Sequence, residues 1–391
     1  MQKINSAKFI FLILLLPLFL TGCYDRYELD NLAYVIAIGV DPSDEGEGNK
    51  NITYQIAVPL KITGENSETG KDTYTTYTVT APSLSMGNTL VNAKLSKEIN
   101  LSHIKLILYS EDIAKSSLSG YVNVFMSHAQ IRPKVTFAIC EGKAEDFLKE
   151  VSPRLEVSPA RYYELLFSSH NYTSQTAGSE LVDFYTSSQS IDREPFSTYV
   201  KLSSGDKKEA MHSGLAVFKG SKMIGVLEPN LILAHSLLTN SLKKASYSVP
   251  DLNEKDRVVS VNIDQQSVPL INLELDGDKP KIKCKLKLHA HLVSSGSDIN
   301  FYDKGNKDKL TDELNKNLEK EISAYLDKTI KEYESDIAGI GRIAKTKFLT
   351  WKEFEDYNWL SKYKNATYEV EVETDLNISQ VISHKVPNSE E

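Results

Sequence analysis

The chain has 391 residues, of which 41% are hydrophobic and 25% are charged. This composition is typical of folded domains and excludes disordered, collagen-like and coiled-coil chains. A mean hydropathy of −0.31 excludes a protein with many membrane spans. The formal net charge of −8 and a pI near 5.6 argue against a general nucleic-acid-binding protein. With domains of roughly 150 residues, the length predicts two or three domains.

Residues 1–22 have the pattern of an export signal. Lys3 and Lys8 form a short basic start, and 9–20 is an unbroken apolar run. Such a run spans about 18 Å as a helix, which is too short for a hydrocarbon core of about 30 Å. The segment is therefore predicted to be a cleaved secretory signal peptide.

The signal ends in Leu20-Thr21-Gly22-Cys23, which resembles the lipobox of bacterial lipoproteins. Small residues before the cysteine let the backbone enter a peptidase, and the thiol can form a thioether to diacylglycerol. We predict that Cys23 is lipidated, with an S-diacylglyceryl group and an N-acyl chain such as palmitate. Two acyl chains supply the stable anchoring that one chain does not. The alternative is a buried or unpaired cysteine that merely follows a signal peptide.

Cleavage before Cys23 removes Lys3 and Lys8, which changes the formal net charge from −8 to −10. The mature protein is then expected to be an acidic body tethered to the outer face of a membrane.

Strands and helices alternate over the first part of the mature chain. Apolar runs and β-branched or Thr/Tyr-rich segments predict strands at 33–40, 51–60, 73–80, 103–109 and 134–140. The strand at 73–80 is expected at a sheet edge. Helical patterns begin after Ser83 and after Ser110, and further ones lie at 143–151, 160–168 and 179–187. In the first of them, one apolar stripe is formed by Leu84, Val91, Leu95 and Ile99. The alternation predicts an α/β domain that closes near residue 200.

The second part is richer in strands. A polar break at 203–209 precedes a hairpin at 214–227, a short helix at 231–242, and strands at 257–263, 268–275 and 281–293. Basic residues alternate with apolar ones in the last of these, which predicts a sheet with one solvent-exposed face. A long amphipathic helix at 308–335 and a strand at 366–374 follow. These elements predict one or two α+β domains, and Cys140 and Cys284 are expected to be buried free thiols in different domains.

No catalytic, metal or cofactor motif stands out. Three S-x-x-K matches, at Ser204, Ser241 and Ser361, lack the further motifs of penicillin-recognising enzymes. His289 and His291 share one strand face and could form a zinc pair, but no third ligand is near in sequence. The acidic residues at 41–47 lack the order of a calcium loop. We therefore predict no catalytic, metal or cofactor-binding residue and expect no enzyme activity.

Four groups of residues together resemble the Ger(x)C family, the lipoprotein C subunit of nutrient germinant receptors in endospore-forming bacteria. They are 22–29 (GCYDRYEL) with 37–41 (AIGVD), His103-Ile104-Lys105 with Ile131-Arg132, 214–219 (GLAVFK) with 223–225 (MIG), and Ser335-Asp336-Ile337 with Gly339, Gly341 and Trp351. The resemblance follows the whole chain in order. Tyr24 replaces the usual Trp, and 127–130 (SHAQ) stands where an R-D-P-like run is common.

The resemblance implies a three-domain arrangement of mixed β-sheets with packed helices, α/β followed by α+β, after the signal peptide. We place the boundaries at 1–22 for the signal, 23–200 for the N-terminal domain, 201–265 for a small middle domain with the hairpin, and 266–391 for the C-terminal domain. It also implies a non-enzymatic receptor subunit on the outer face of the spore inner membrane, with integral membrane subunits as partners. Two alternatives are a solute-binding lipoprotein of a transporter and a secreted lipid-anchored hydrolase.

Overall fold

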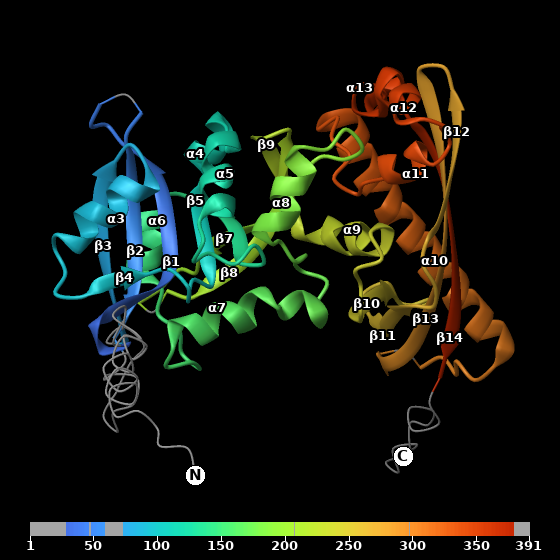
Figure 1. The fold of residues 1–391 in the computed structure, drawn as a ribbon. Coiled ribbons are helices and arrows are strands. Elements are labelled where there is room, and N and C mark those ends of the chain that lie inside the picture. The colour runs from blue at the N-terminus through green and yellow to red at the C-terminus, as the bar shows by residue number, and fades with distance from the viewer. Residues whose placement is uncertain (1–28, 47, 59–72, 207, 297, 379–391) are drawn as a thin grey trace, which may run out of the picture.

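The computed structural model describes residues 29–46, 48–58, 73–206, 208–296 and 298–378. Its strands form two sheets, the first at the left of Figure 1 and the second at the right. We call residues 29–227, which include the first sheet, the first half, and residues 228–378 the second half. No helix among the described residues is long and apolar enough to cross a bilayer. Cys23 and the signal peptide lie outside the described residues.

The first sheet is mixed, with the strand order β3-β2-β1-β5-β6-β7-β8-β9 and β4 beside the start of β1. Its strands are β1 (Leu32–Pro42), β2 (Lys50–Ala57), β3 (Tyr74–Ala81), β4 (Glu98–Asn100), β5 (Leu106–Ser110), β6 (Thr136–Cys140), β7 (Phe196–Leu202), β8 (Ala210–Lys219) and β9 (Lys222–Leu227). Strands β1, β5, β6 and β7 run parallel, whereas β2, β3, β8 and β9 are antiparallel to their neighbours.

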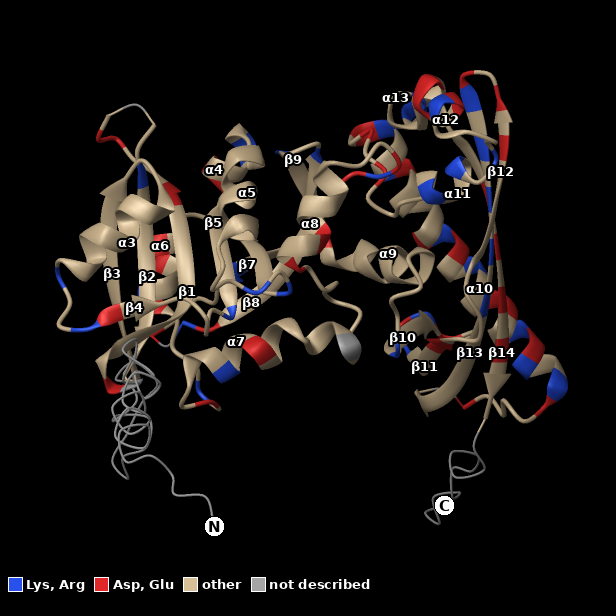
Figure 2. Cartoon of the chain, viewed as in Figure 1, with Lys and Arg blue, Asp and Glu red and all other residues tan. Residues whose placement is uncertain are grey.

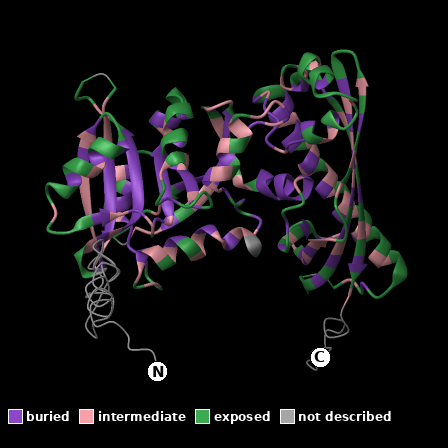
Figure 3. Ribbon diagram, in the orientation of Figure 1, coloured by how far each residue is buried: buried purple, intermediate pink, exposed green. Residues whose placement is uncertain are grey.

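Helices cover both faces of the first sheet. One face carries α3 (Leu84–Asn92), α4 (Glu111–Ser116), α5 (Ser119–Ser127) and α8 (Leu181–Ser188), and the other carries α6 (Ala144–Glu150) and α7 (Pro159–Phe167). Alternate residues of β1 enter the two cores, with Ile38 in one and Ala37 in the other. The central strands are therefore buried on both faces (Figure 3), which explains their unbroken apolar runs.

The second sheet packs one face against helices and exposes the other. Its strands are β10 (Ala245–Pro250), β11 (Val258–Gln265), β12 (Leu270–Asp276), β13 (Lys279–Ser295) and β14 (Thr367–Asn377), and its helices are α9 (Ile232–Leu238), α10 (Lys304–Asp327), α11 (Gly341–Lys345), α12 (Trp351–Tyr357) and α13 (Trp359–Lys362). Inward-facing Ile282, Cys284 and Leu286 of β13 join the core with α10. The alternating lysines of β13 face solvent. Lys281, Lys285 and Lys287 pair with glutamates of β14, and Lys283 pairs with Glu274 of β12.

The observed fold confirms the prediction of mixed sheets with packed helices. The predicted edge position of β3 is also correct, and α3 begins directly after Ser83 as expected, with the Ser83 side chain as its N-cap. The predicted helical stripe was too long, because α3 ends at Asn92 and Ile99 lies in β4. The segment 201–265 forms no sheet of its own: β8 and β9 extend the first sheet, whereas β10 and β11 belong to the second. A hairpin pattern in sequence does not specify which free sheet edge the hairpin joins.

The two thiols lie in different sheets, as expected. Cys140 ends β6 and Cys284 lies within β13, and both are free and buried. Burial raises the pKa of the Cys284 thiol to about 12, and it raises that of Cys140 as well. Both side chains are therefore protonated, inert parts of their cores at neutral pH.

Candidate functional site

The first motif group fixes helix α6 against the end of β1. Gly39 lies so close to α6 that an added Cβ would stand 3.0 Å from the Leu148 side chain and 3.1 Å from Ala144. Two residues later, the buried carboxylate of Asp41 accepts hydrogen bonds from the backbone N–H groups of Ala144 and Glu145, both at 2.8 Å. Asp41 thus caps a helix that is more than 100 positions away in sequence.

The last motif group forms a junction between the two halves, which we call the Asp336 junction. It consists of residues 333–341 and their partners on the β8–β9 hairpin and in the segment 190–195. The Tyr333 hydroxyl donates to the Val226 carbonyl at 2.8 Å. The Ser335 hydroxyl donates to the Phe218 carbonyl at 2.7 Å. These bonds attach the segment that follows α10 to the edge of the first sheet.

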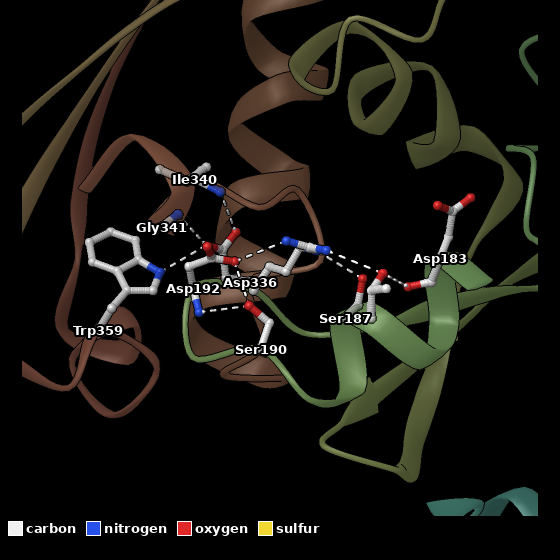
Figure 4. A network of polar contacts seen from close by, with 10 residues as sticks. Asp183, Ser187, Ser190, Asp192, Asp336, Ile340, Gly341 and Trp359 are labelled. Atoms are coloured by element: carbon white, nitrogen blue, oxygen red, sulfur yellow. Dashed lines mark hydrogen bonds and ion pairs between the residues drawn. The ribbon is translucent and has the colours of Figure 1, made fainter. Parts of the chain in front are cut away.

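Asp336 is the centre of this junction (Figure 4). Its carboxylate is fully buried and accepts from the backbone N–H of Ile340 at 3.0 Å, from that of Gly341 at 2.7 Å and from the Trp359 indole N–H at 2.8 Å. Burial raises the pKa of Asp336 to about 6, although these three donors favour the ionised form. The side chain therefore binds together the start of α11 and the start of α13.

The segment 190–195 of the first half packs directly on the Asp336 loop. The Glu194 backbone N–H donates to the Asp336 carbonyl at 3.0 Å, and the Glu194 carboxylate accepts from the Gly220 N–H at 2.6 Å. No side chain fits at Gly341, because a Cβ there would lie 2.3 Å from the Asp192 carbonyl oxygen and 2.4 Å from the Trp359 ring. The junction therefore depends on close approach of two backbones.

A cleft of about 350 Å³ lies between the halves next to this junction. Its lining includes Arg193, Phe196, His235, Gly339 and Arg342. The buried His235 ring shares a hydrogen bond with the Tyr325 hydroxyl at 2.9 Å, and burial lowers its pKa to about 4. A neutral, fully packed imidazole of this kind is a core group rather than a poised base.

The second motif group meets in a groove of about 860 Å³ at one end of the first sheet. His103, Lys105 and Arg132 line it together with Lys134 and with Lys243 of the second half. Among the described residues, Lys105 pairs with Glu164 at 3.7 Å, whereas no ion pair is formed by Arg132, Lys134 or Lys243. Glu164, Glu180 and Asp183 also line the groove. The sequence motif thus marks a charged groove that linear spacing alone did not reveal.

The other sequence candidates remain apart. His289 lies on the exposed face of β13, 3.6 Å from the Asp375 carboxylate, and His291 is exposed. Within the described ranges no group of three His, Cys, Asp or Glu side chains is arranged to hold a metal ion. Of the S-x-x-K serines, Ser361 donates to the Asn358 carbonyl, and Ser241 lines the cleft without its lysine, Lys244.

The tryptophan that contacts Asp336 is not the one in the last motif group. Trp351 was matched to the tryptophan of the last motif group, but its side chain is 55% exposed and lies under the Lys345 ammonium. Trp359 instead holds Asp336. Trp351 follows Gly341 by 10 residues and Trp359 follows it by 18, and only the fold shows which of the two reaches Asp336.

Comparison with known proteins identifies the family of the chain. Residues 25–202 match the family model described as spore germination protein N-terminal domain, and residues 213–380 match the one described as spore germination B3/GerAC like, C-terminal. The chain is 22% identical over 366 residues to putative spore germination protein YfkR of Bacillus subtilis (strain 168), covering 88% of this chain and 90% of that one. It is 20% identical to spore germination protein GerQC of Bacillus cereus, covering 95% and 98%.

A solved structure has the same fold. The crystal structure of the GerBC protein superposes with a TM-score of 0.57 at 15% identity, covering 87% of this chain and 96% of that chain. Two family models in the expected order, over most of the chain, agree with the sequence motifs. The chain therefore belongs to the GerAC-like spore germination family, the family of the germinant receptor C subunits.

Proposed function

We propose that this chain is the lipid-anchored, non-enzymatic C subunit of a nutrient germinant receptor. It would sit on the outer face of the spore inner membrane and act with integral membrane subunits to trigger germination. The observation that carries the proposal is the lipobox sequence ending at Cys23 directly before a body that matches both germination family models.

The geometry of the described residues supports a binding role. The residues of the first and last motif groups serve helix capping and close packing, as Asp41 and Asp336 illustrate. Such groups hold surfaces in a fixed relation, which suits a subunit that docks on partners. The halves also differ in strand order and direction, whereas a solute-binding lipoprotein of a transporter predicts two similar lobes.

The test replaces Cys23 with Ala in a sporulating host whose germination depends on this chain. We expect loss of lipid label, loss of the protein from the membrane fraction and loss of nutrient-triggered germination. Thr21→Ser is the matched control, because it keeps a small residue in the lipobox and should behave as wild type. Persistence of both germination and lipid labelling in Cys23→Ala spores would show that the anchored-receptor proposal is wrong.

Co-purification separates the receptor from the transporter alternative. Detergent extracts of spores with the wild-type chain should yield integral membrane subunits of a germinant receptor together with this chain. Recovery of the permease of a transporter instead would contradict the proposal.

A further inference from the structure

The two ends of the first sheet carry opposite charge. At the end where β1, β5 and β6 begin, the described segments 29–35, 92–105, 128–136 and 151–164 contain seven Lys or Arg and four Asp or Glu. At the end where these strands finish, segments 41–46, 48–50, 110–118 and 140–147 contain three Lys and eight Asp or Glu. We call these the amino edge and the carboxyl edge. In this acidic protein the amino-edge segments thus carry an excess of three basic residues, interspersed with acidic ones (Figure 2).

Pairing places the amino-edge segments together. Strand β4 pairs with the first residues of β1, and the His103 ring lies 4.7 Å from the Tyr34 ring. Because β5 and β6 run parallel to β1, the loop 128–135 before β6 lies at the same edge. The loop 152–158 reaches it through a hydrogen bond of 2.8 Å from the Thr73 hydroxyl to the Val157 carbonyl.

The cations of this edge are available to a partner. Lys94, Lys97, Arg132 and Lys134 are exposed and form no ion pair within the described part of the chain. The loop 152–158 adds an apolar tip, since Leu155 is 94% exposed. Free cations and an exposed aliphatic side chain at the same edge are the combination that favours contact with an anionic lipid surface.

The anchor would hold this edge near the membrane. Only the five residues 24–28 separate Cys23 from Leu29, where the described chain begins at the amino edge. At no more than about 3.6 Å per residue, Leu29 stays within roughly 22 Å of the lipidated residue. The carboxyl edge, at the far ends of the same strands, is repelled by negative headgroups.

We propose that the amino edge of the first sheet docks on anionic phospholipid headgroups, with Leu155 at the interface and the carboxyl edge facing away. This inference rests on the proposed lipidation of Cys23. It assigns the orientation of the anchored body, which leaves the carboxyl edge and the exposed face of the second sheet open to protein partners.

The test uses the lipidated full-length product reconstituted on phosphatidylcholine vesicles with and without phosphatidylglycerol. Ala129→Cys provides a fluorophore site on the amino edge, and Ser117→Cys provides the matched site on the carboxyl edge. The native Cys140 and Cys284 are buried and free, so the introduced thiol is labelled selectively. Spin-labelled headgroups in the vesicle quench a fluorophore that lies at the surface.

We expect quenching at residue 129 only on vesicles that contain phosphatidylglycerol, weakening as salt rises, and no quenching at residue 117. Each removed cation should lower the ratio of docked to undocked protein about fivefold. The double variant Arg132→Glu/Lys134→Glu should therefore lose at least about 25-fold. The control Lys115→Glu/Lys143→Glu, which alters the carboxyl edge by the same charge, should dock as wild type.

Three results would overturn the proposal. If the protein floats with both vesicle types but residue 129 is not quenched, the anchor stands and the docking surface is wrong. Quenching that needs added integral membrane subunits would show that the amino edge binds protein. If the chain floats with neither vesicle and its N-terminal peptide carries no lipid mass, the anchor and the docking surface both fail.

Discussion

The Asp336 junction makes a quantitative prediction for Asp336→Asn. The carboxylate accepts three N–H donors, with Ile340 on one oxygen and both Gly341 and Trp359 on the other. Asparagine keeps one acceptor oxygen. Its best orientation points that oxygen at the Gly341 and Trp359 N–H groups and turns its NH₂ group toward the Ile340 N–H. One buried donor loses its partner, which costs about 1–3 kcal/mol.

This cost should appear as local opening of the second half. Cys284 shares a core with Trp359, whereas Cys140 lies in the separate core of the first half. If the thiols react from transiently open states, a cost of about 1–3 kcal/mol raises the labelling rate of Cys284 by roughly fivefold to 150-fold. Labelling of Cys140 should not change. The assay is the rate of thiol modification under native conditions at pH 7.5, read by mass spectrometry for each cysteine.

The matched control is Asp278→Asn. Its carboxylate pairs with Lys362 at 3.0 Å but is 79% exposed. Loss of this charge should therefore change the labelling rate of Cys284 or of Cys140 by less than about twofold to threefold. A Cys284 rate in Asp336→Asn within twofold of wild type would refute the argument that the buried donors depend on this carboxylate. Equal acceleration of both thiols would show that the two halves open as one unit.

Three further outcomes follow from the same contacts. Because the pKa of Asp336 is raised above its ordinary 3.8 to about 6, its contribution to stability is present below pH 4 and is lost as pH rises through 6. The Cys284 rate, divided by the rate of an unprotected thiol at the same pH, should therefore increase from pH 5 to pH 7 in wild type and stay level in Asp336→Asn. Gly225→Ala should separate the hairpin from Tyr333, since the new Cβ would stand 2.5 Å from that ring, and hydrogen exchange should increase in β9. Lys285→Ala should lower the free energy of unfolding by less than about 1 kcal/mol in denaturant titration, because its glutamate partners on β14 are about half exposed.

Local pattern determined much of the fold. The apolar run at 33–40, the alternation of β13 and the start of a helix after Ser83 each depend on neighbouring residues, and each was predicted at nearly its observed place. Strands β7 and β10 were missed. The β7 sequence (FSTYVKL) does contain β-branched and aromatic residues, whereas β10 (ASYSVP) is short and rich in Ser, and its pairing with β11 supplies what its own sequence lacks.

The features of the candidate site also fall into those predicted from sequence and those that only the structure showed. The predictions of an export signal, of the cysteine after it and of the motif residues come from sequence by itself, because these are read from adjacent positions. Only the tertiary structure decided that Asp41 caps α6, that Trp359 rather than Trp351 binds Asp336, and that the motif cations share one edge. Each of these contacts joins positions distant in sequence, and strand order, which no local pattern encodes, brings them together.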